Sequence, residues 1–383
     1  MLRVLTLSTL YPDAARPAFG AFVERQTLAL AERAGVAVEV VAPVGLPIWP
    51  LSLHSHYRLL ASLPAEERRG GVIVHRPRFR VWPRIDEAGA ARRLAGAVLP
   101  LLRRLAFDVI DAEFFWPDGV AAMHLAEALG LPFSIKARGS DIHFWGNRPK
   151  IAPQLLAAAR RAGGLLAVSE ALKRDMAALG MPEERIRVHY TGVDRDRFRP
   201  LDRAGAKARL GVEGPLLVSP GNLVPLKGHR LAVEALRHLP GATLLIAGEG
   251  PERGAIERLI AARRLGGRTR LLGAVAPDGM PELLAAADLM VLPSEREGLA
   301  NVWLEALACG TPLLIADVGG AREVVDRPEA GRLVERDPGA IASAALEMLA
   351  EPPDAEAVRA AAERFSWARN AAELHSHLAG LVS

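Results

Sequence analysis

The sequence is poor in cysteine and in long apolar runs. Cys309 is the only cysteine among 383 residues, which excludes an intrachain disulfide and a cysteine-based zinc site. Arg103, Arg104 and Asp288 interrupt the richest apolar stretches, so none reaches the roughly 18 residues that a membrane-spanning helix needs. The apolar run after Met1 is also too short for a signal peptide. We therefore expect a cytoplasmic protein without a transmembrane segment.

Aromatic residues are also scarce, at 5% of the chain, whereas hydrophobic residues make up 50%. A chain with this much apolar surface is not disordered. At roughly 100–200 residues per domain, its length predicts two domains. The dominance of Ala, Leu, Val and Gly is typical of helices packed on parallel strands.

Positive charge is concentrated in the first half of the chain. Residues 1–200 contain 28 Lys/Arg and 20 Asp/Glu, a net charge of +8, whereas residues 201–383 contain 20 and 24, a net charge of −4. An anionic partner such as a phosphorylated substrate, a membrane surface or a nucleic acid is therefore expected to meet the first half. Nucleic acid is the least favoured, because aromatic and basic residues do not alternate and no recognition motif is present.

Short apolar runs alternate with Ala- and Leu-rich helical stretches along the whole chain. Runs without polar alternation predict parallel strands buried on both faces, as in doubly wound sheets. The predicted strands are Val4–Leu7, Val36–Ala42, Val72–His75, Val109–Ala112, Pro132–Lys136, Leu165–Val168, Ile186–His189, Leu216–Ser219, Thr243–Ala247, Thr269–Leu272, Leu289–Leu292, Pro312–Ile315 and Gly331–Val334. The fold class is therefore α/β.

The alternation breaks at residues 195–214, where charged residues, Pro200 and glycines accumulate. We predict a first domain over 1–199, a linker over 200–214, a second domain over 215–364 and a last helix over 365–383. Two similar α/β domains facing across a cleft would make that cleft the default ligand site.

The densest candidate motif is Pro293–Asn301, which follows a predicted strand and precedes a helix ending near Gly310. Asn301 is predicted as the N-cap of that helix, whose first backbone N–H groups suit a phosphate or a sugar hydroxyl. Glu297 lies in the loop and Glu305 on the helix, and paired carboxylates can accept hydrogen bonds from vicinal hydroxyls. The alternative is that both glutamates are solvated surface residues.

Three further strand-end loops contain candidate residues. Lys227 precedes Gly228 in a strand-to-helix loop, from which a lysine can reach a diphosphate, although such a pair is often only a turn. Gly20 ends a long loop after the first strand and permits close backbone approach to a ligand. The third loop follows the strand that ends at Lys136 and contributes Arg138, Asp141 and His143. Those three line a ligand site or merely form a capped turn.

Taken together, these residues resemble the signature of family-4 glycosyltransferases, the retaining nucleotide-sugar enzymes of the two-domain GT-B fold. The central match is Glu297-x7-Glu305 within PSEREGLANVWLEALACGTPLLIADVGGAREVV. Supporting matches are YPDAARPAFGAFVERQ at 11–26, RGSDI at 138–142, VSEALKRDM at 168–176, TGVDRDRFRP at 191–200, GNLVPLKGH at 221–229, AGEGPE at 247–252 and FSW at 365–367. The resemblance implies two Rossmann-like domains, an acceptor-side first domain, a donor-binding second domain, and a last helix that crosses back to the first domain.

The resemblance also implies roles for individual residues. Lys227 would bind the donor diphosphate, Glu297 the hydroxyls of the transferred sugar, and Glu305 the ribose. Donor-facing backbone would come from Gly20, Gly298, Leu299 and Ala300, and the catalytic set would be Glu297, Lys227 and Arg138. Asp141 and His143 would face the acceptor.

Two positions depart from the family pattern. Asn222 stands in the donor loop where many members have arginine, and Arg138 stands where many have histidine. An acid or base role for that histidine therefore does not transfer to this chain, and the arginine favours an electrostatic role for Arg138 instead. We expect no metal and no cofactor, because the strand-end loops that contain the candidate donor residues have no Asp-x-Asp cluster, and cations with helix N-termini would stabilise the leaving diphosphate.

The acceptor is expected to be a saccharide or a lipid-pyrophosphate-linked saccharide of cell-surface polysaccharide or glycoconjugate biosynthesis. The basic stretch Arg68–Arg84 would contact an anionic membrane and make the protein peripheral at its inner face, or it is a solvated basic surface. The donor would be UDP- or GDP-linked. Two other functions stay open, namely a nucleotide-sugar epimerase of the same architecture and a noncatalytic nucleotide-sugar-binding protein.

Overall fold

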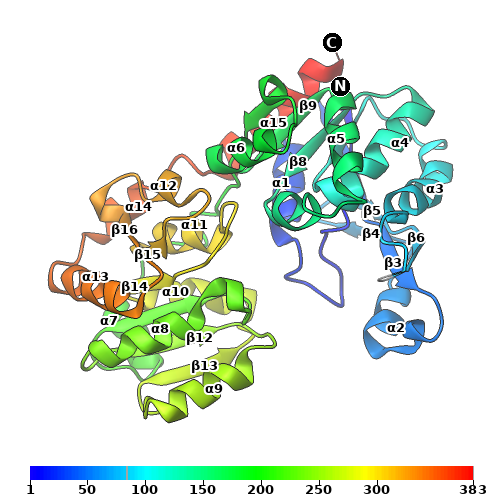
Figure 1. Ribbon diagram of the computed structural model, residues 1–383. Coiled ribbons are helices and arrows are strands. Elements are labelled where there is room, and N and C mark those ends of the chain that lie inside the picture. Colours follow the sequence, from blue (N-terminus) through cyan, green and yellow to red (C-terminus); the bar gives the residue numbers. More distant parts are fainter. Residues whose placement is uncertain (83–84, 383) are drawn as a thin grey trace. The chain divides into compact units, whose positions relative to one another are not determined.

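The computed structural model describes residues 1–82 and 85–382, so Arg84 of the predicted basic stretch lies outside the described residues. The chain forms two compact units (Figure 1). The first comprises Met1–Thr191 together with Trp367–Ser383, and the second comprises Gly192–Ser366.

The first unit is built on an eight-stranded sheet with the order β10-β9-β8-β7-β1-β2-β5-β4. All neighbouring pairs are parallel except β4 with β5. The strands are β1 (Leu2–Leu7), β2 (Val36–Val41), β4 (Glu66–Arg69), β5 (Val72–His75), β7 (Val109–Ala112), β8 (Phe133–Ala137), β9 (Gly164–Ala167) and β10 (Ile186–Val188), and a separate parallel pair is formed by β3 (Val44–Pro47) and β6 (Arg78–Val81).

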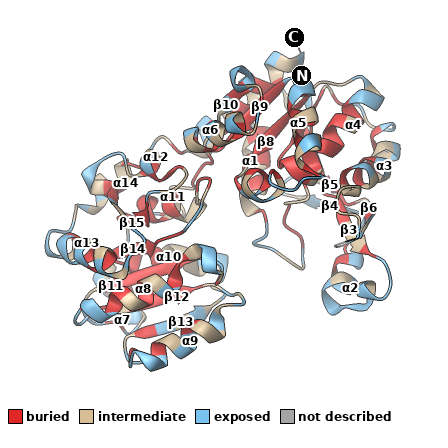
Figure 2. Ribbon diagram, viewed as in Figure 1, coloured by how far each residue is buried: buried red, intermediate tan, exposed pale blue. Residues whose placement is uncertain are grey.

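Helices cover this sheet because its central strands are buried on both faces. Strands β7, β8 and β9 are buried along their whole length, and β8 and β9 can be followed in Figure 2. The helices are α1 (Ala21–Ala31), α2 (Ser55–Ala61), α3 (Ala90–Leu102), α4 (Val120–Leu129), α5 (Ala152–Arg161), α6 (Glu170–Ala178) and α15 (Trp367–Val382), with short helical turns at Leu51–Leu53, Phe115–Gly119, Asp141–Trp145 and Glu183–Arg185.

The last helix, α15, packs in the first unit although the second unit precedes it in the sequence. Leu374 and Leu378 are buried in one apolar cluster with Val4 and Val109. His377 Nε2 lies 2.8 Å from the hydroxyl of Ser134, which fixes the helix against β8. The prediction that the last helix crosses back to the first domain is confirmed.

The second unit is built on a six-stranded parallel sheet with the order β13-β12-β11-β14-β15-β16. The strands are β11 (Leu216–Pro220), β12 (Thr243–Ala247), β13 (Thr269–Gly273), β14 (Leu289–Leu292), β15 (Leu313–Ala316) and β16 (Gly331–Val334). The helices are α7 (Arg203–Arg209), α8 (His229–Ala235), α9 (Arg253–Ala262), α10 (Met280–Ala286), α11 (Asn301–Ala308), α12 (Ala321–Val324), α13 (Pro338–Ala350) and α14 (Ala355–Ala360), with short turns at Pro225–Lys227, Leu236–His238, Pro277–Gly279 and Pro328–Ala330.

Every strand predicted from an apolar run is present, which confirms two doubly wound α/β domains. The pattern missed β3, β4 and β6, because a four-residue strand such as Glu66–Arg69 with little burial has no apolar run. The segment 200–214, predicted as a linker, instead contains α7 and belongs to the second unit. Lys207 anchors that helix through Asp288, with 2.5 Å between Nζ and Oδ2. Lys207, one of the charged residues that suggested a linker, therefore helps to hold α7 in the second unit.

Candidate functional site

The strand order of the second sheet reverses between β11 and β14, which are neighbours although β12 and β13 lie between them in sequence. At such a switch point, the loops leaving the two carboxyl ends diverge and leave room for a ligand. The loop after β11 contains Asn222 and Lys227, and the loop after β14 contains Glu297. The sheet topology therefore brings two of the three predicted donor segments together.

Lys227 and Glu297 form an ion pair, with 2.5 Å between Nζ and Oε1. Their side chains are 21% and 11% exposed, so both are largely removed from solvent. The lysine ends the short turn Pro225–Lys227, and Gly228 follows it in the left-handed conformation with φ of 72°. The pair places one cation and one carboxylate at the same point of the sheet edge.

Close backbone contacts hold these loops in position. A Cβ at Gly228 would lie 2.3 Å from the Pro293 carbonyl oxygen, and one at Gly319 would lie 2.0 Å from the Glu297 carbonyl oxygen. Both distances are shorter than any side chain tolerates, so glycine is required at each position. Glu295 also donates its backbone N–H to the Leu226 carbonyl at 2.7 Å. Backbone contacts therefore fasten the two loops to each other in addition to the ion pair.

His229 fastens the Lys227 loop from inside. Its Nδ1 lies 2.9 Å from the hydroxyl of Ser219, and its Nε2 lies 3.2 Å from the carbonyl oxygen of Asn222. Burial, with a smaller contribution from the charge of Lys227, lowers the pKa of His229 to about 4. The neutral imidazole therefore has a structural role, because its two hydrogen bonds link Ser219 to the loop at Asn222.

The start of α11 offers backbone donors beside the ion pair. Within the described ranges, no acceptor is recorded for the N–H groups of Gly298, Leu299 and Ala300. The helix begins at Asn301, and Ala300 is its N-cap with no side-chain capping bond, so the prediction of Asn301 as N-cap is wrong by one residue. Asn301 fails as a cap because its backbone is already helical. Glu305, in the second turn, is partly buried.

In the first unit, Arg138 is held by a glutamate that sequence analysis missed. Arg138 Nη2 pairs with the carboxylate of Glu113, whose side chain is fully buried, while that of Arg138 is 7% exposed. The guanidinium also lies 4.7 Å from the ring centroid of Phe22. Arg138 Nη1 is buried and makes no hydrogen bond within the described part of the chain. Glu113 directly follows β7. The criterion used for the other candidates, a polar residue in the loop after a predicted strand, would therefore have identified it.

A buried lysine, Lys136, lies close to the Arg138–Glu113 pair. Its Nζ lies 2.5 Å from Gln26 Oε1 and 2.8 Å from His189 Nδ1. Burial and then the charge of Arg138 lower the pKa of Lys136 to about 7. Burial opposes ionisation of Glu113, but Arg138 and Lys136 together lower its pKa. The cluster therefore keeps one carboxylate ionised between two buried bases.

The other predicted residues of the first unit have structural partners. Asp141 is buried and accepts the backbone N–H groups of Gly139 at 2.8 Å, Arg138 at 3.0 Å and Phe115 at 3.1 Å, so it fixes the turn. His143 Nε2 lies 2.8 Å from Asp175 Oδ2. The Cβ of any other residue at Gly20 would lie 2.2 Å from the Leu10 carbonyl oxygen, which accounts for that glycine within its own loop. Their ligand contacts remain predictions.

The first unit has its own switch point, between β1 and β7. A cavity of about 380 Å³ lies there, with Thr9, Leu10, Trp116 and Pro117 from the loops after those strands in its wall. Six aromatic side chains line the cavity, namely Phe19, Tyr57, Phe79, Trp82, Trp116 and Trp145. The wall also contains the charged residues Arg16, Asp86 and Glu87. A cavity that combines aromatic faces with some polar groups at a switch point is typical of a binding site for an organic ligand.

The predicted basic stretch is only partly available to a membrane. Arg76 is buried, pairs with Glu67 and donates to the Pro12 carbonyl at 2.7 Å. Arg78 donates to the carbonyl of Arg76 at 2.9 Å and also to that of Leu63. Their charges stabilise the chain reversal around β5, so the two arginines are not free for lipid headgroups.

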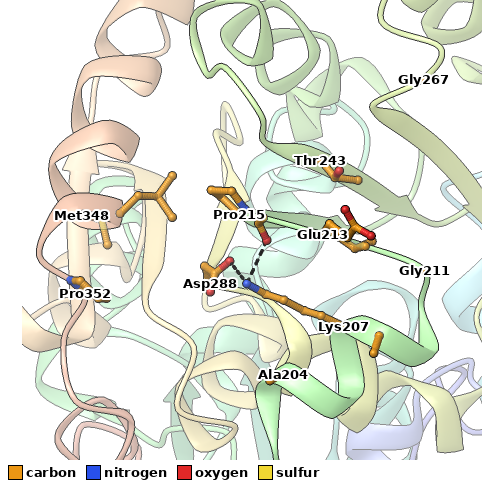
Figure 3. Close-up of a pocket in the computed structure, with 14 residues that line it drawn as sticks. Ala204, Lys207, Gly211, Glu213, Pro215, Thr243, Gly267, Asp288, Met348 and Pro352 are labelled. Atoms are coloured by element: carbon orange, nitrogen blue, oxygen red, sulfur yellow. Dashed lines mark hydrogen bonds and ion pairs between the residues drawn. The ribbon is translucent and has the colours of Figure 1, made fainter.

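The second unit also has a groove of about 930 Å³ at the opposite edge of its sheet (Figure 3). Pro215, Thr243 and Asp288 lie there at the amino ends of their strands. Lys207 in its wall is bound to Asp288 and, at 3.1 Å, to the carbonyl of Gly214. The groove therefore lies away from the strand ends that hold Lys227 and Glu297.

Two properties bear on cofactors and membranes. Among the described residues, no three His, Cys, Asp or Glu side chains are grouped so that they could hold a metal ion. No helix in the described ranges has the length and apolar character needed to span a bilayer.

Two family models match the chain in succession. The model described as Glycosyltransferase Family 4 matches residues 22–197, and the one described as Glycosyl transferases group 1 matches residues 203–365. Together they match residues 22–365 apart from 198–202.

Curated relatives extend over nearly the whole chain. The glycosyltransferase TuaC of Bacillus subtilis, assigned to teichuronic acid biosynthesis, is 29% identical over 98% of this chain and 97% of its own length. A D-inositol 3-phosphate glycosyltransferase of Thermobispora bispora is 30% identical over 81% of each chain.

Solved structures share the fold. Sucrose-phosphate synthase of Thermosynechococcus elongatus has a TM-score of 0.84 and 20% identity over 100% of this chain and 99% of its own. HepE of Anabaena in complex with UDP-glucose has a TM-score of 0.76 and 21% identity over 100% of each chain.

Proposed function

The chain belongs to glycosyltransferase family 4, and on that premise we propose that it transfers a sugar, with retention of configuration, from a nucleotide-sugar donor to a saccharide or lipid-linked saccharide acceptor. The observation that supports this most directly is the Lys227–Glu297 pair at the switch point of the second unit. A cation for a diphosphate and a carboxylate for sugar hydroxyls are the two groups that a nucleotide-sugar donor requires.

The donor position is supported by the surrounding backbone. The N–H groups of Gly298, Leu299 and Ala300 lie at the start of α11, where the helix dipole favours an anion. Glu305, one helical turn further along, would bind the ribose hydroxyls. The relative HepE is described with UDP-glucose bound, and a UDP- or GDP-linked donor is proposed for this chain on that likeness and on the cation.

The chemistry we propose needs neither a metal nor a covalent intermediate. As the bond from the anomeric carbon to the diphosphate oxygen breaks, Lys227 and the N–H groups of α11 would stabilise the charge that develops on the leaving group. The acceptor hydroxyl would attack from the same face, and its proton would pass to the departing phosphate oxygen. Arg138 would act electrostatically, since Glu113 fixes its guanidinium and leaves Nη1 without a protein partner among the described residues.

The acceptor would bind in the aromatic cavity of the first unit. Sugar rings and apolar chains both pack on aromatic faces, and Arg16 lies 4.4 Å from the ring centroid of Phe19 at the cavity wall. The likeness to TuaC over almost the full chain favours an acceptor in the biosynthesis of a cell-surface polysaccharide. We therefore propose a cytoplasmic enzyme that meets this acceptor at the membrane.

A thermal-shift comparison tests the donor assignment. The wild-type chain and its Lys227→Ala variant are each heated without ligand and with UDP-, GDP- and ADP-sugars. A donor at about 100 times its dissociation constant stabilises the folded state by about 2.7 kcal/mol. We expect a shift with one nucleotide class and its loss in the variant. The absence of any shift, or an equal shift in the variant, would contradict the assignment.

A further inference from the structure

An apolar projection of the first unit has an outer face that neither site uses. It consists of Ile48–Leu59, comprising the loop before the turn Leu51–Leu53, that turn, and most of α2, and we call it the apolar lobe. Its exposed large hydrophobic residues are Ile48, Trp49, Leu51, Leu53 and Leu59, and Trp49 is 73% exposed. In Figures 1 and 2, α2 projects from the body of the first unit and is largely exposed.

Local hydrogen bonds hold these side chains in a compact group. Ser52 donates its N–H to the Ile48 carbonyl at 3.2 Å, Leu53 to the Pro50 carbonyl at 3.0 Å, and His54 to the Leu51 carbonyl at 3.1 Å. The apolar residues are thus carried on successive tight turns rather than spread along an extended chain. Gathered exposed apolar residues of this kind mark an interaction site, whereas single ones need no explanation.

The lobe has a buried side and an exposed side. Leu60, at 4% exposure, packs with Val44 and Leu63, which anchors α2 to the first unit. Leu59, next to it on the same helix, is 52% exposed. Because Leu60 already anchors α2 to the first unit, the exposed leucines and Trp49 are not required for folding of this segment.

The charge of the segment favours a lipid surface as its partner. Residues 48–63 contain Arg58 and two histidines but no Asp or Glu, so no acidic residue of this segment repels anionic headgroups. Arg58 is exposed, and tryptophan prefers the interface between headgroups and acyl chains. Apolar side chains at the tip with a cation behind them are typical of a segment that lies in that interface.

We propose that the apolar lobe docks the first unit on the surface of a lipid bilayer by inserting Trp49, Leu51 and Leu53 among the lipids. This deepens the proposed function and rests on its lipid-linked acceptor. The inner face of α2 supplies His56, Tyr57 and Leu60 to the wall of the aromatic cavity. Docking through the outer face therefore brings that cavity to the bilayer surface, where a lipid-linked saccharide is presented.

This proposal differs from the electrostatic contact expected of the basic stretch. Two arginines of that stretch are engaged within the protein, whereas the apolar lobe is free of such partners at its tip. Insertion of apolar side chains is not screened by salt, whereas attraction to headgroups is. Salt dependence therefore separates the two mechanisms.

The experiment is co-sedimentation of the full chain with vesicles of phosphatidylcholine, with and without phosphatidylglycerol, at low salt and at about 0.5 M salt. The test variant is Trp49→Glu/Leu53→Glu, and the control is Leu346→Glu, a leucine of 46% exposure on α13 of the second unit. We expect wild-type and control binding to persist at high salt, and the test variant to bind at least tenfold more weakly. Circular dichroism confirms that all three are folded.

Three results would overturn the proposal. In the first, the wild type binds neither kind of vesicle. In the second, the test variant binds as tightly as the wild type, and in the third, high salt abolishes wild-type binding. Size-exclusion chromatography adds a fourth, since self-association lost in the test variant would assign the lobe to a second copy of the chain.

The vesicle assay contains neither donor nor acceptor, so its result is separate from that of the donor assignment. If vesicles bind through the lobe but no nucleotide-sugar shifts the melting temperature, the docking surface stands and the proposed function fails. If nucleotide-sugars bind and vesicles do not, the lobe proposal alone is overturned.

Discussion

Lys227 Nζ lies 2.5 Å from Glu297 Oε1, although the residues are 70 positions apart in sequence. The contact exists because β11 and β14 are adjacent in the sheet and both loops leave the same edge. Without a donor, the two charges neutralise each other and hold both side chains near one position. A donor would replace this contact by giving the lysine a phosphate and the carboxylate hydroxyl groups.

Removal of either member of this pair is expected to lower turnover more than tenfold while leaving the fold intact. Both side chains are partly exposed and lie in loops fastened by backbone contacts, so the loss is one of donor binding and charge stabilisation. The measurement is the rate of sugar transfer by Lys227→Ala and Glu297→Ala, with circular dichroism of each.

The matched controls are Glu295→Ala, in the same loop with a side chain 54% exposed, and Lys150→Ala, on the surface of the first unit. Both are expected to retain wild-type rates. Wild-type rates in Lys227→Ala and Glu297→Ala would remove the basis of the site assignment.

Gly228→Ala is expected to disturb the site more than the same change at Gly241. Their φ angles are 72° and 74°, but a Cβ at Gly228 meets the Pro293 carbonyl oxygen at 2.3 Å, whereas one at Gly241 meets nothing within 4 Å. Each variant pays backbone strain of about 1 kcal/mol. Only Gly228→Ala must also displace the Glu297 loop, so its turnover should fall at least tenfold. Equal turnover in the two variants would show that loop spacing is not critical.

The buried Arg138–Glu113 pair should couple strongly in urea unfolding. Loss of one member of a buried pair typically costs about 3–5 kcal/mol, because the other charge stays buried without its partner. The double variant Glu113→Gln/Arg138→Gln should therefore be more stable than the sum of its single variants predicts, by more than about 1 kcal/mol. The exposed pair Arg161–Glu127 is the control and should show no measurable coupling. Additive effects in the buried pair would contradict the ion pair.

Stability of the second unit is expected to fall with acidification through His229. Its pKa is about 4 in the folded state against about 6.5 when unfolded. Above pH 6.5 neither state is protonated and the contribution is complete. Between pH 6.5 and 4 the unfolded state takes up the proton first, so up to about 3 kcal/mol is lost. Urea unfolding at pH 7 and pH 5 should show a smaller difference for His229→Asn than for wild type, and identical differences would refute the assignment.

Transfer is expected to proceed without a divalent cation. In the proposed mechanism, Lys227 and the backbone donors of α11 would supply the charge that a metal would otherwise provide. Rates should be unchanged after treatment with EDTA. A tenfold loss that Mg²⁺ restores would show that these groups are insufficient.

The apolar runs in the sequence were enough to place all the strands of the second sheet and all but β4 of the first, because strands buried on both faces are mostly apolar. The short strands β3, β4 and β6 could not be found this way, since each is partly exposed and is defined by its pairing partner. The prediction of a linker over 200–214 is wrong for a related reason. A packed helix whose charged residues form salt bridges has the same amino-acid composition as a charged loop.

The sequence by itself determined the two α/β domains and the Glu297-x7-Glu305 motif, because both depend on local pattern and spacing. Only the tertiary structure decided which charges meet. It joined Arg138 to Glu113, seated Lys136 against Gln26 across 110 positions, and used Arg76 in packing rather than at the surface. It also left Trp49 and its neighbours exposed, since burial depends on what the fold brings near a side chain and not on the side chain's own polarity.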